Sequence, residues 1–139
     1  MPTLTAADAV RRAQLLAGCF LLYLFVLPLI VEKFFPKTSG GFDQRVFVAI
    51  CLVCVAEIAI ALVIRSRFPL TTEEVTLPAA DEPARTRKWL TIQIASYAIA
   101  MSVALYGVAL RAIGAPLAKV TPFYIAALVL LIIWWPRRR

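Results

Sequence analysis

The sequence predicts an all-α membrane protein of four antiparallel transmembrane helices, on the basis of its composition, the length of its apolar segments and the placement of its charges. Hydrophobic residues make up 62% of the 139-residue chain, and its mean hydropathy is +0.84. A soluble domain holds roughly 45–50% apolar residues, and one this small has too much surface for its volume to hide the excess. Residues 1–139 are therefore expected to form a single integral membrane domain.

Four apolar segments are long enough to cross a hydrocarbon core of roughly 30 Å at about 1.5 Å per residue. We expect transmembrane helices over residues 13–35, 46–64, 89–112 and 120–135. Pro28 predicts a kink near the far end of the first helix. The fourth helix is the shortest, so its ends are expected to depend on aromatic residues at the membrane surface.

The three connections differ in character. Residues 36–45 hold a Thr-Ser-Gly-Gly turn. Residues 113–119 predict a tight turn around Gly114 and Pro116. The longest connection, 65–88, is polar, and a short middle helix is one possibility there. Its prolines favour extended chain instead: Pro69, Pro78 and Pro83.

The start of the chain predicts a helix that begins before the membrane. Thr5 and Asp8 have the spacing of a capping box, in which two side chains bond the free backbone N–H groups of a helix start. That helix would continue through Arg11 and Arg12 into the membrane. The Leu-Leu-Ala-Gly-Cys sequence ending at Cys19 has the form of a lipoprotein cleavage box. Its long apolar run follows the Cys instead of preceding it, so we expect no processing.

The basic residues predict the orientation in the membrane. Of the 15 Lys and Arg residues, ten would lie on the side of the two chain ends: Arg11, Arg12, Arg65, Arg67, Arg85, Arg87, Lys88, Arg137, Arg138 and Arg139. The other side would hold five: Lys33, Lys37, Arg45, Arg111 and Lys119. Cytoplasmic loops carry the excess of Lys and Arg, so both termini are expected in the cytoplasm of a bacterial-type inner membrane. Three residues at that interface are expected to be anchors: Trp89, Trp134 and Trp135.

Several function classes lack their residues in this chain. The net charge is +7, but the basic residues flank apolar runs, which favours a membrane surface over nucleic acid as the partner. The chain has no His, and it lacks a Ser/His/Asp set, a glycine-rich phosphate loop and metal-ligand spacing. Cys51 and Cys54 have CxxC spacing, which inside an apolar helix is more typical of packing than of thiol redox work. We expect no enzyme, no cofactor and no metal.

Glu57 is the residue that most needs an explanation. It lies eight residues before Arg65, about 12 Å from the end of the second helix and inside the hydrocarbon. An ionised carboxylate there costs several kcal/mol, so Glu57 is expected to be neutral or to face a polar partner. Three readings stay open: a bond between helices, a proton or ion site, or a contact with another subunit.

Candidate partners for Glu57 follow from depth in the neighbouring helix. Counting from the cytoplasmic ends places Gln93, Ser96 and Tyr97 of the third helix level with Glu57. We expect Glu57 to turn towards Ser96 or Tyr97. The same stripe continues through small residues, which allow close helix packing, and we expect the second and third helices to pack along it: Ala100, Ala104 and Gly107.

Two segments are similar to parts of one family. The sequence Ala-Glu-Ile-Ala-Ile-Ala-Leu at 56–62 resembles the carboxylate-bearing helix of rotary ATPase subunit c, and Ala-Leu-Tyr-Gly at 104–107 is similar to the end of the same motif. Met101 stands where the third helix would need the carboxylate, and the glycine-rich partner helix of that family is absent. The resemblance implies that Glu57 binds H⁺ or Na⁺.

Two functional hypotheses follow. The first is a structural or accessory subunit of a larger membrane complex, because the chain is small, lacks a catalytic set and carries stripes suited to helix contacts. Its partners would be the bilayer and other membrane subunits or copies of itself. The alternative is a small proton- or ion-translocating membrane protein that works through Glu57.

Overall fold

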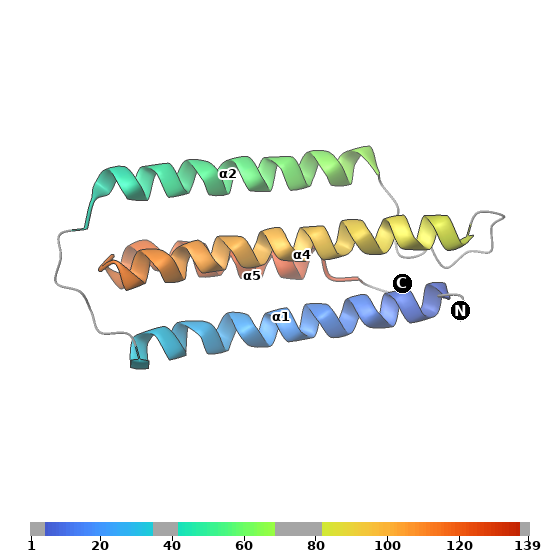
Figure 1. The fold of residues 1–139 in the computed structure, drawn as a ribbon, viewed down its shortest axis with the longest axis horizontal. Coiled ribbons are helices and arrows are strands. Elements are labelled where there is room, and N and C mark those ends of the chain that lie inside the picture. The colour runs from blue at the N-terminus through green and yellow to red at the C-terminus, as the bar shows by residue number, and fades with distance from the viewer. Residues whose placement is uncertain (1–4, 35–41, 69–81, 137–139) are drawn as a thin grey trace.

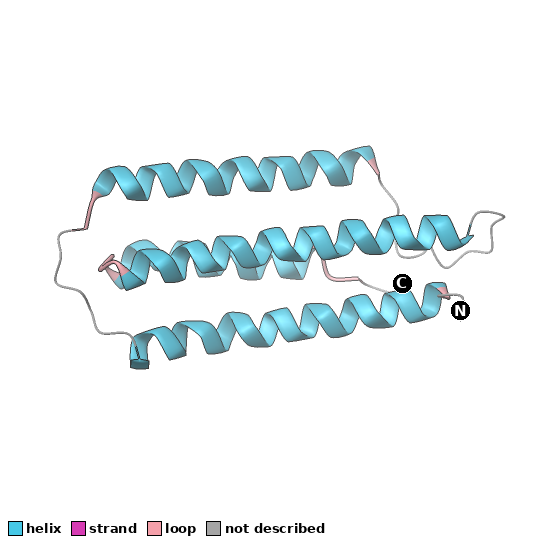
Figure 2. Cartoon of the chain, in the orientation of Figure 1, coloured by secondary structure: helices cyan, strands magenta, loops and turns pink. Residues whose placement is uncertain are grey.

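The computed structural model describes residues 5–34, 42–68 and 82–136. They form four helices and no strand (Figures 1 and 2): α1 (Ala6–Phe34), α2 (Gln44–Arg67), α4 (Glu82–Ala112) and α5 (Leu117–Ile133). The all-α prediction is confirmed for this part of the chain. The expected turn at 38–41, the prolines at 69 and 78, and the basic residues at 137–139 lie outside the described residues.

The expected capping box starts α1. The backbone N–H of Asp8 donates to Thr5 Oγ1 at 3.2 Å, and the Thr5 hydroxyl donates to Asp8 Oδ2 at 2.6 Å. The first bond satisfies a backbone N–H that the first turn of a helix leaves free, and the second joins the two side chains of the predicted box. The helix begins at Ala6 and continues past Pro28 to Phe34. Its first two turns precede the apolar segment, as the sequence predicts.

The helix α4 begins seven residues earlier than the predicted start at Trp89. It starts at Glu82, and Pro83 stands in its first turn. The expectation of extended chain over 82–88 is therefore wrong. Proline is tolerated in the first turn of a helix because the N–H that it lacks has no partner there. Pro83 starts this helix and does not interrupt it.

A glycine turn joins α4 to α5. Gly114 has a φ of 99°, its N–H donates to the Arg111 carbonyl, and the N–H of Ala115 donates to the Leu110 carbonyl. This pair of bonds is the Schellman motif, whose left-handed residue is usually glycine. Pro116 then precedes α5, which has 17 residues. The predicted tight turn is confirmed.

The central helix is α4. It packs against α1, α2 and α5, and α1 also packs against α5. Figure 1 shows α4 lying lengthwise between α1 and α2, with α5 beside it. The backbone of α2 approaches only α4 among the described helices. The helix α2 is therefore at the edge of the bundle.

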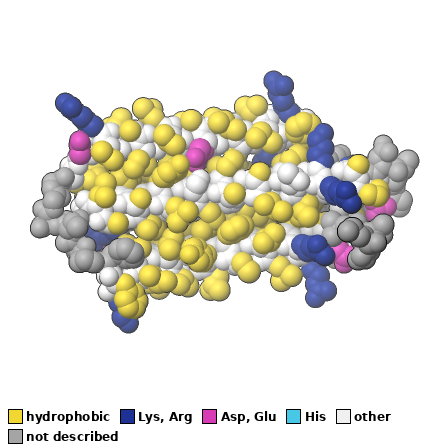
Figure 3. Space-filling view, in the orientation of Figure 1, with side chains coloured by type: hydrophobic (Ala, Val, Ile, Leu, Met, Phe, Trp, Pro, Cys, Tyr) yellow, Lys and Arg dark blue, Asp and Glu magenta, His cyan; other side chains and the backbone are white. Residues whose placement is uncertain are grey.

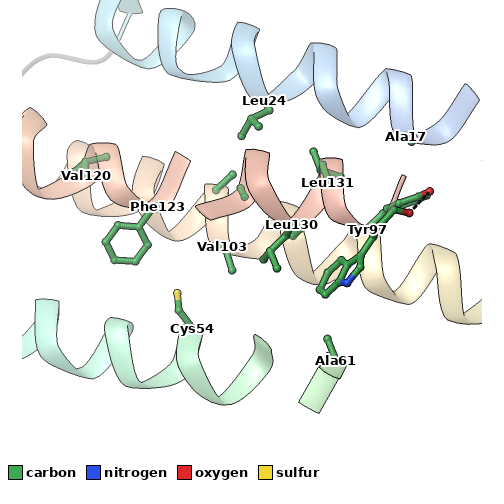
Figure 4. Close-up of a cluster of buried hydrophobic side chains, with 14 of the residues drawn as sticks. Ala17, Leu24, Cys54, Ala61, Tyr97, Val103, Val120, Phe123, Leu130 and Leu131 are labelled. Carbon is green, nitrogen blue, oxygen red and sulfur yellow. Dashed lines mark hydrogen bonds between the residues drawn. The ribbon is translucent and has the colours of Figure 1, made fainter. Parts of the chain in front are cut away.

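Two buried clusters hold the helices together. The larger runs along α4 and α5, and Cys54 and Ala61 of α2 point into it (Figure 4). A smaller cluster joins the start of α1 to the start of α4, and it consists of Ala6, Ala9, Val10, Ala13 and Trp89. The bundle thus has a second core beside the predicted membrane region.

Most of the outer surface of α1 and α2 is apolar. Leu22 and Leu29 of α1 and Leu52 of α2 are each at least two-thirds exposed. Figure 3 shows hydrophobic side chains along the length of the helices, with Lys and Arg gathered towards the ends. By length and composition α1, α2 and α4 are suited to crossing a membrane, and α5 is a shorter apolar helix. This surface is typical of a chain surrounded by lipid.

Candidate functional site

Glu57 lies near the middle of α2 and bonds to two hydroxyl groups of α4. Ser102 Oγ donates to Glu57 Oε2 at 2.8 Å, and Tyr106 Oη donates to Glu57 Oε1 at 2.9 Å. Ser102 and Tyr106 are one helical turn apart, so they share a face of α4. The Glu57 side chain is half-buried, between the helix contact and the outer surface of α2. The predicted polar partner exists, but it is a different pair of residues.

The expected contact of Glu57 with Ser96 or Tyr97 is wrong because the two helices meet in another register. That expectation pairs Arg65 with Lys88, the ends of the two apolar segments. In the structure Arg65 bonds to Gln93 and Ser96. The level of Arg65 on α4 is therefore shifted from Lys88 by roughly two turns at 3.6 residues per turn. The same shift moves Glu57 to Ser102 and Tyr106.

Gln93, Ser96 and Tyr97 do come together, but around Arg65. Arg65 Nη1 donates to Gln93 Oε1 at 2.6 Å and to Ser96 Oγ at 3.0 Å. Its guanidinium also lies 5.4 Å from the centre of the Trp134 ring, close enough for a cation–π attraction. This polar cluster, Arg65 with Gln93, Ser96 and Tyr97, ties the end of α2 to α4.

Gln93 also holds the end of α5. Its Nε2 donates to the Trp134 carbonyl at 2.9 Å, and Tyr97 Oη donates to the same carbonyl at 3.3 Å. The last carbonyl groups of a helix lack partners within the helix. A buried carbonyl without a partner is costly, so Gln93 and Tyr97 stabilise the end of α5 inside the protein. Gln93 is the residue that links α2, α4 and α5.

The helices α2 and α4 pack together as predicted, but one residue of the small-residue stripe packs against another helix. Ala100, Ala104 and Gly107 are all buried. A Cβ atom added at Gly107 would lie 3.0 Å from Phe123 Cβ and 3.3 Å from Tyr124 Cε1. Both of those residues belong to α5, so Gly107 permits the close approach of α4 to α5. The expected packing of Gly107 against α2 is wrong.

Two of the three expected interfacial anchors are core residues. Trp89 is 4% exposed in the smaller cluster, and Trp134 is 3% exposed in the larger one. An anchoring ring has to present its surface to the headgroups, whereas these two rings are enclosed by other side chains of the bundle. Trp135 is half-buried and only packs against the edge of the larger cluster. Trp135 remains the one candidate anchor of the three.

An ion pair at the other end of the bundle was missing from the sequence predictions. Arg111 of α4 donates through Nε and Nη2 to the two carboxylate oxygens of Glu32 of α1. Arg111 Nη1 also donates to the Ala115 carbonyl at 2.9 Å. Bidentate Arg–carboxylate pairs fix geometry more firmly than single bonds. The sequence signal for this pair was the placement of two opposite charges at the same predicted depth. The signal for the partners of Glu57 was the spacing of Ser102 and Tyr106, two polar residues four positions apart in an apolar helix.

The described residues contain no group of three or more His, Cys, Asp or Glu side chains that is placed to hold a metal ion. Cys19, Cys51 and Cys54 are free thiols, and Cys54 is buried against the larger core. The polar groups that join helices thus include the Glu57 site, the Glu32–Arg111 pair and the Arg65 cluster, which reaches α2, α4 and the end of α5. Lys119 of α5 also donates to Gln44 of α2 at 2.8 Å.

Comparisons with protein-family models, with curated proteins and with solved structures found no match for the chain.

Proposed function

We propose that the chain is a multi-pass protein of a bacterial-type inner membrane, with four helices of alternating direction and both ends in the cytoplasm. The apolar lengths of α1, α2 and α4 support a membrane location. The excess of Lys and Arg at one end supports the orientation, because such residues gather on the cytoplasmic side. The short α5 would cross the membrane with the help of Trp135, which follows it.

Within that membrane the proposed role is structural, as a small accessory subunit of a larger complex or of an assembly of its own copies. The observation that carries this proposal is how the polar side chains are engaged. Glu57, Arg65, Gln93 and Arg111 all bond to other parts of the same chain. The outward faces of α1 and α2 are consequently apolar, which suits lipid and neighbouring membrane helices. The proposal assigns no catalytic role and no nucleic-acid partner.

Native purification tests the structural role. A tagged chain is extracted from its own membranes in mild detergent, and the proteins that travel with it are identified and quantified by mass spectrometry. We expect stoichiometric membrane partners, or a defined oligomer of the chain, because the apolar faces of α1 and α2 are available for helix contacts. A chain that runs as a monomer without partners would contradict the proposal. A control with an unrelated tagged membrane protein removes adventitious detergent-resistant contacts.

A second candidate function is proton or ion translocation through Glu57. The observation that favours it is the position of a carboxylate near the middle of α2, half-buried and bonded to two hydroxyl groups. Ionisable residues inside membrane segments are costly, and they often mark ion pathways. Glu57 is half-buried, so part of its side chain is left open for a neighbouring subunit.

The substitution Glu57→Gln separates the two functions. If the role is structural, the variant should assemble as the wild type does, because an amide of the same shape can still bond to Ser102 and Tyr106. If the chain moves protons or ions, the variant should lose the flux in liposomes, because an amide neither takes up a proton near neutral pH nor carries the negative charge that attracts a cation. Glu32→Gln is the matched control and should keep the flux. Loss of assembly in Glu57→Gln would count against both functions.

A further inference from the structure

The groups around Glu57 satisfy its ionised form. Both carboxylate oxygens accept a hydrogen bond, one from Ser102 and one from Tyr106, at 2.8 and 2.9 Å. Buried polar groups are stable only when they are hydrogen-bonded. The ionised carboxylate therefore has partners although α2 is apolar on both sides of it.

The same groups also satisfy the protonated form. Ser102 Oγ lies within hydrogen-bond distance of a second acceptor, the Ile99 carbonyl, at 3.2 Å. A hydroxyl group has one hydrogen and can also accept, so Ser102 donates fully either to Glu57 or to Ile99. When Glu57 is protonated at Oε2, it can donate to Ser102 Oγ while the Ser102 hydrogen turns to Ile99. Tyr106 continues to donate to Glu57 Oε1 throughout.

We propose that Glu57, Ser102 and Tyr106 form a reversible proton-binding site, in which rotation of the Ser102 hydroxyl keeps every hydrogen bond paired in both states. The proton comes from water, and the only bond that forms or breaks is the O–H bond of the Glu57 carboxyl. The proposal deepens the transport candidate and rests on the proposed position of α2 in the membrane. It holds whether or not the chain also serves as a subunit.

The surroundings of Glu57 favour a proton as the ligand. The helix packed against this part of α2 is α4, and its titratable group at the site is Tyr106. On α2 itself the nearest titratable group is Cys54, one turn away, and no Lys or Arg among the described residues bonds to Glu57. A metal cation would need the lone pairs of Ser102 and Tyr106, whose hydrogens face the carboxylate. A proton requires only the rotation of the Ser102 hydroxyl towards the Ile99 carbonyl.

Infrared difference spectroscopy during a pH titration tests the site. The full chain in lipid nanodiscs is acidified stepwise, and the C=O band of a protonated carboxyl is followed. We expect this band to appear reversibly in the wild type and in Glu32→Gln, and to be absent in Glu57→Gln. Tyr106→Phe should retain the band but move it to higher wavenumber, because the C=O oxygen loses its hydrogen-bond donor.

The outcomes separate this site from the proposed functions. The proposal would be overturned if the acid band were absent at every pH at which the chain stays folded. It would also be overturned if the band had the same wavenumber in Tyr106→Phe as in the wild type. If Glu57→Gln does not fold, the Tyr106→Phe shift still assigns the band. A band that appears only when Na⁺ is removed would show that Na⁺ competes for the site and would overturn the assignment of a proton as its ligand. An assigned band without proton flux in liposomes would support the site and contradict transport.

Discussion

Replacing Gly107 with leucine is expected to separate α5 from α4 and to cost about 3 kcal/mol of the free energy of unfolding. Even one added carbon would lie 3.0 Å from Phe123 Cβ, an atom fixed directly to the backbone of α5. The larger side chain therefore has to displace the whole helix. Thermal unfolding of the purified chain in mild detergent measures the loss, and Gly107→Ala should show a smaller one.

The matched control for this prediction is Gly18 of α1. A Cβ atom added at Gly18 meets nothing within 4 Å. Alanine is more favourable than glycine inside a helix by about 1 kcal/mol, so Gly18→Ala should leave the stability unchanged or raise it. If Gly107→Leu were as stable as the wild type, the close contact of α4 with α5 would be wrong. Equal effects of alanine at both glycines would weaken the same conclusion.

The substitution Gln93→Leu is expected to have the second-largest effect, also about 3 kcal/mol. The loss of the Gln93 amide group removes an acceptor of Arg65 and a donor to the Trp134 carbonyl. Arg65 keeps Ser96 as an acceptor and the Trp134 carbonyl keeps Tyr97 as a donor, so the cost is that of the two lost bonds. A hydrogen bond to a charged group contributes about 1.5–3 kcal/mol and a neutral one about 1 kcal/mol. The measurement is again thermal unfolding, and limited proteolysis near Trp134 should become faster because the end of α5 is less firmly held.

A second glutamine supplies the control for Gln93. Gln14 makes one bond, from Nε2 to the Pro136 carbonyl at 3.1 Å, so Gln14→Leu should cost about 1 kcal/mol or less. Gln93→Glu keeps the acceptor for Arg65 and loses the donor to Trp134, and it should fall between the wild type and Gln93→Leu. In addition, Arg65→Met with Gln93→Leu should cost less than the two effects added together, because the residues are partners. Strict additivity would contradict the cluster.

The helices themselves were predictable to a large extent. Apolar length identified four helices, and the capping box at Thr5 and the glycine turn at Gly114 are both present. The main error in the boundaries came at Pro83, whose meaning depends on where a helix starts: in the first turn it is favourable, and further along it is disruptive. Hydropathy does not show which of the two positions Pro83 occupies. The first turns of α4 are polar, so the apolar segment starts after the helix does.

The partners of the polar residues were harder to predict than their presence. Glu57 was identified as a residue that needs a partner, but its partners are Ser102 and Tyr106. The expected register placed Arg65 and Lys88, the charges nearest the two apolar segments, at the same level. Arg65 instead turns into the helix contact and bonds to Gln93, so a charge at the end of an apolar segment does not mark where two helices are level. Trp89 and Trp134 show the same limit, since aromatic residues near a predicted membrane surface can also be core residues.

The sequence by itself determined the all-α class of the described residues, the presence of four apolar helices among them and the need of Glu57 for a polar partner, because each depends on the free energy of moving a side chain from water to an apolar medium. Only the tertiary structure decided which faces meet. In a lipid environment both the buried and the exposed faces of a helix are apolar, so no hydrophobic period marks the contact side. Among the described residues, the polar bonds between helices and the close approach of α4 to α5 at Gly107 distinguish the faces that meet.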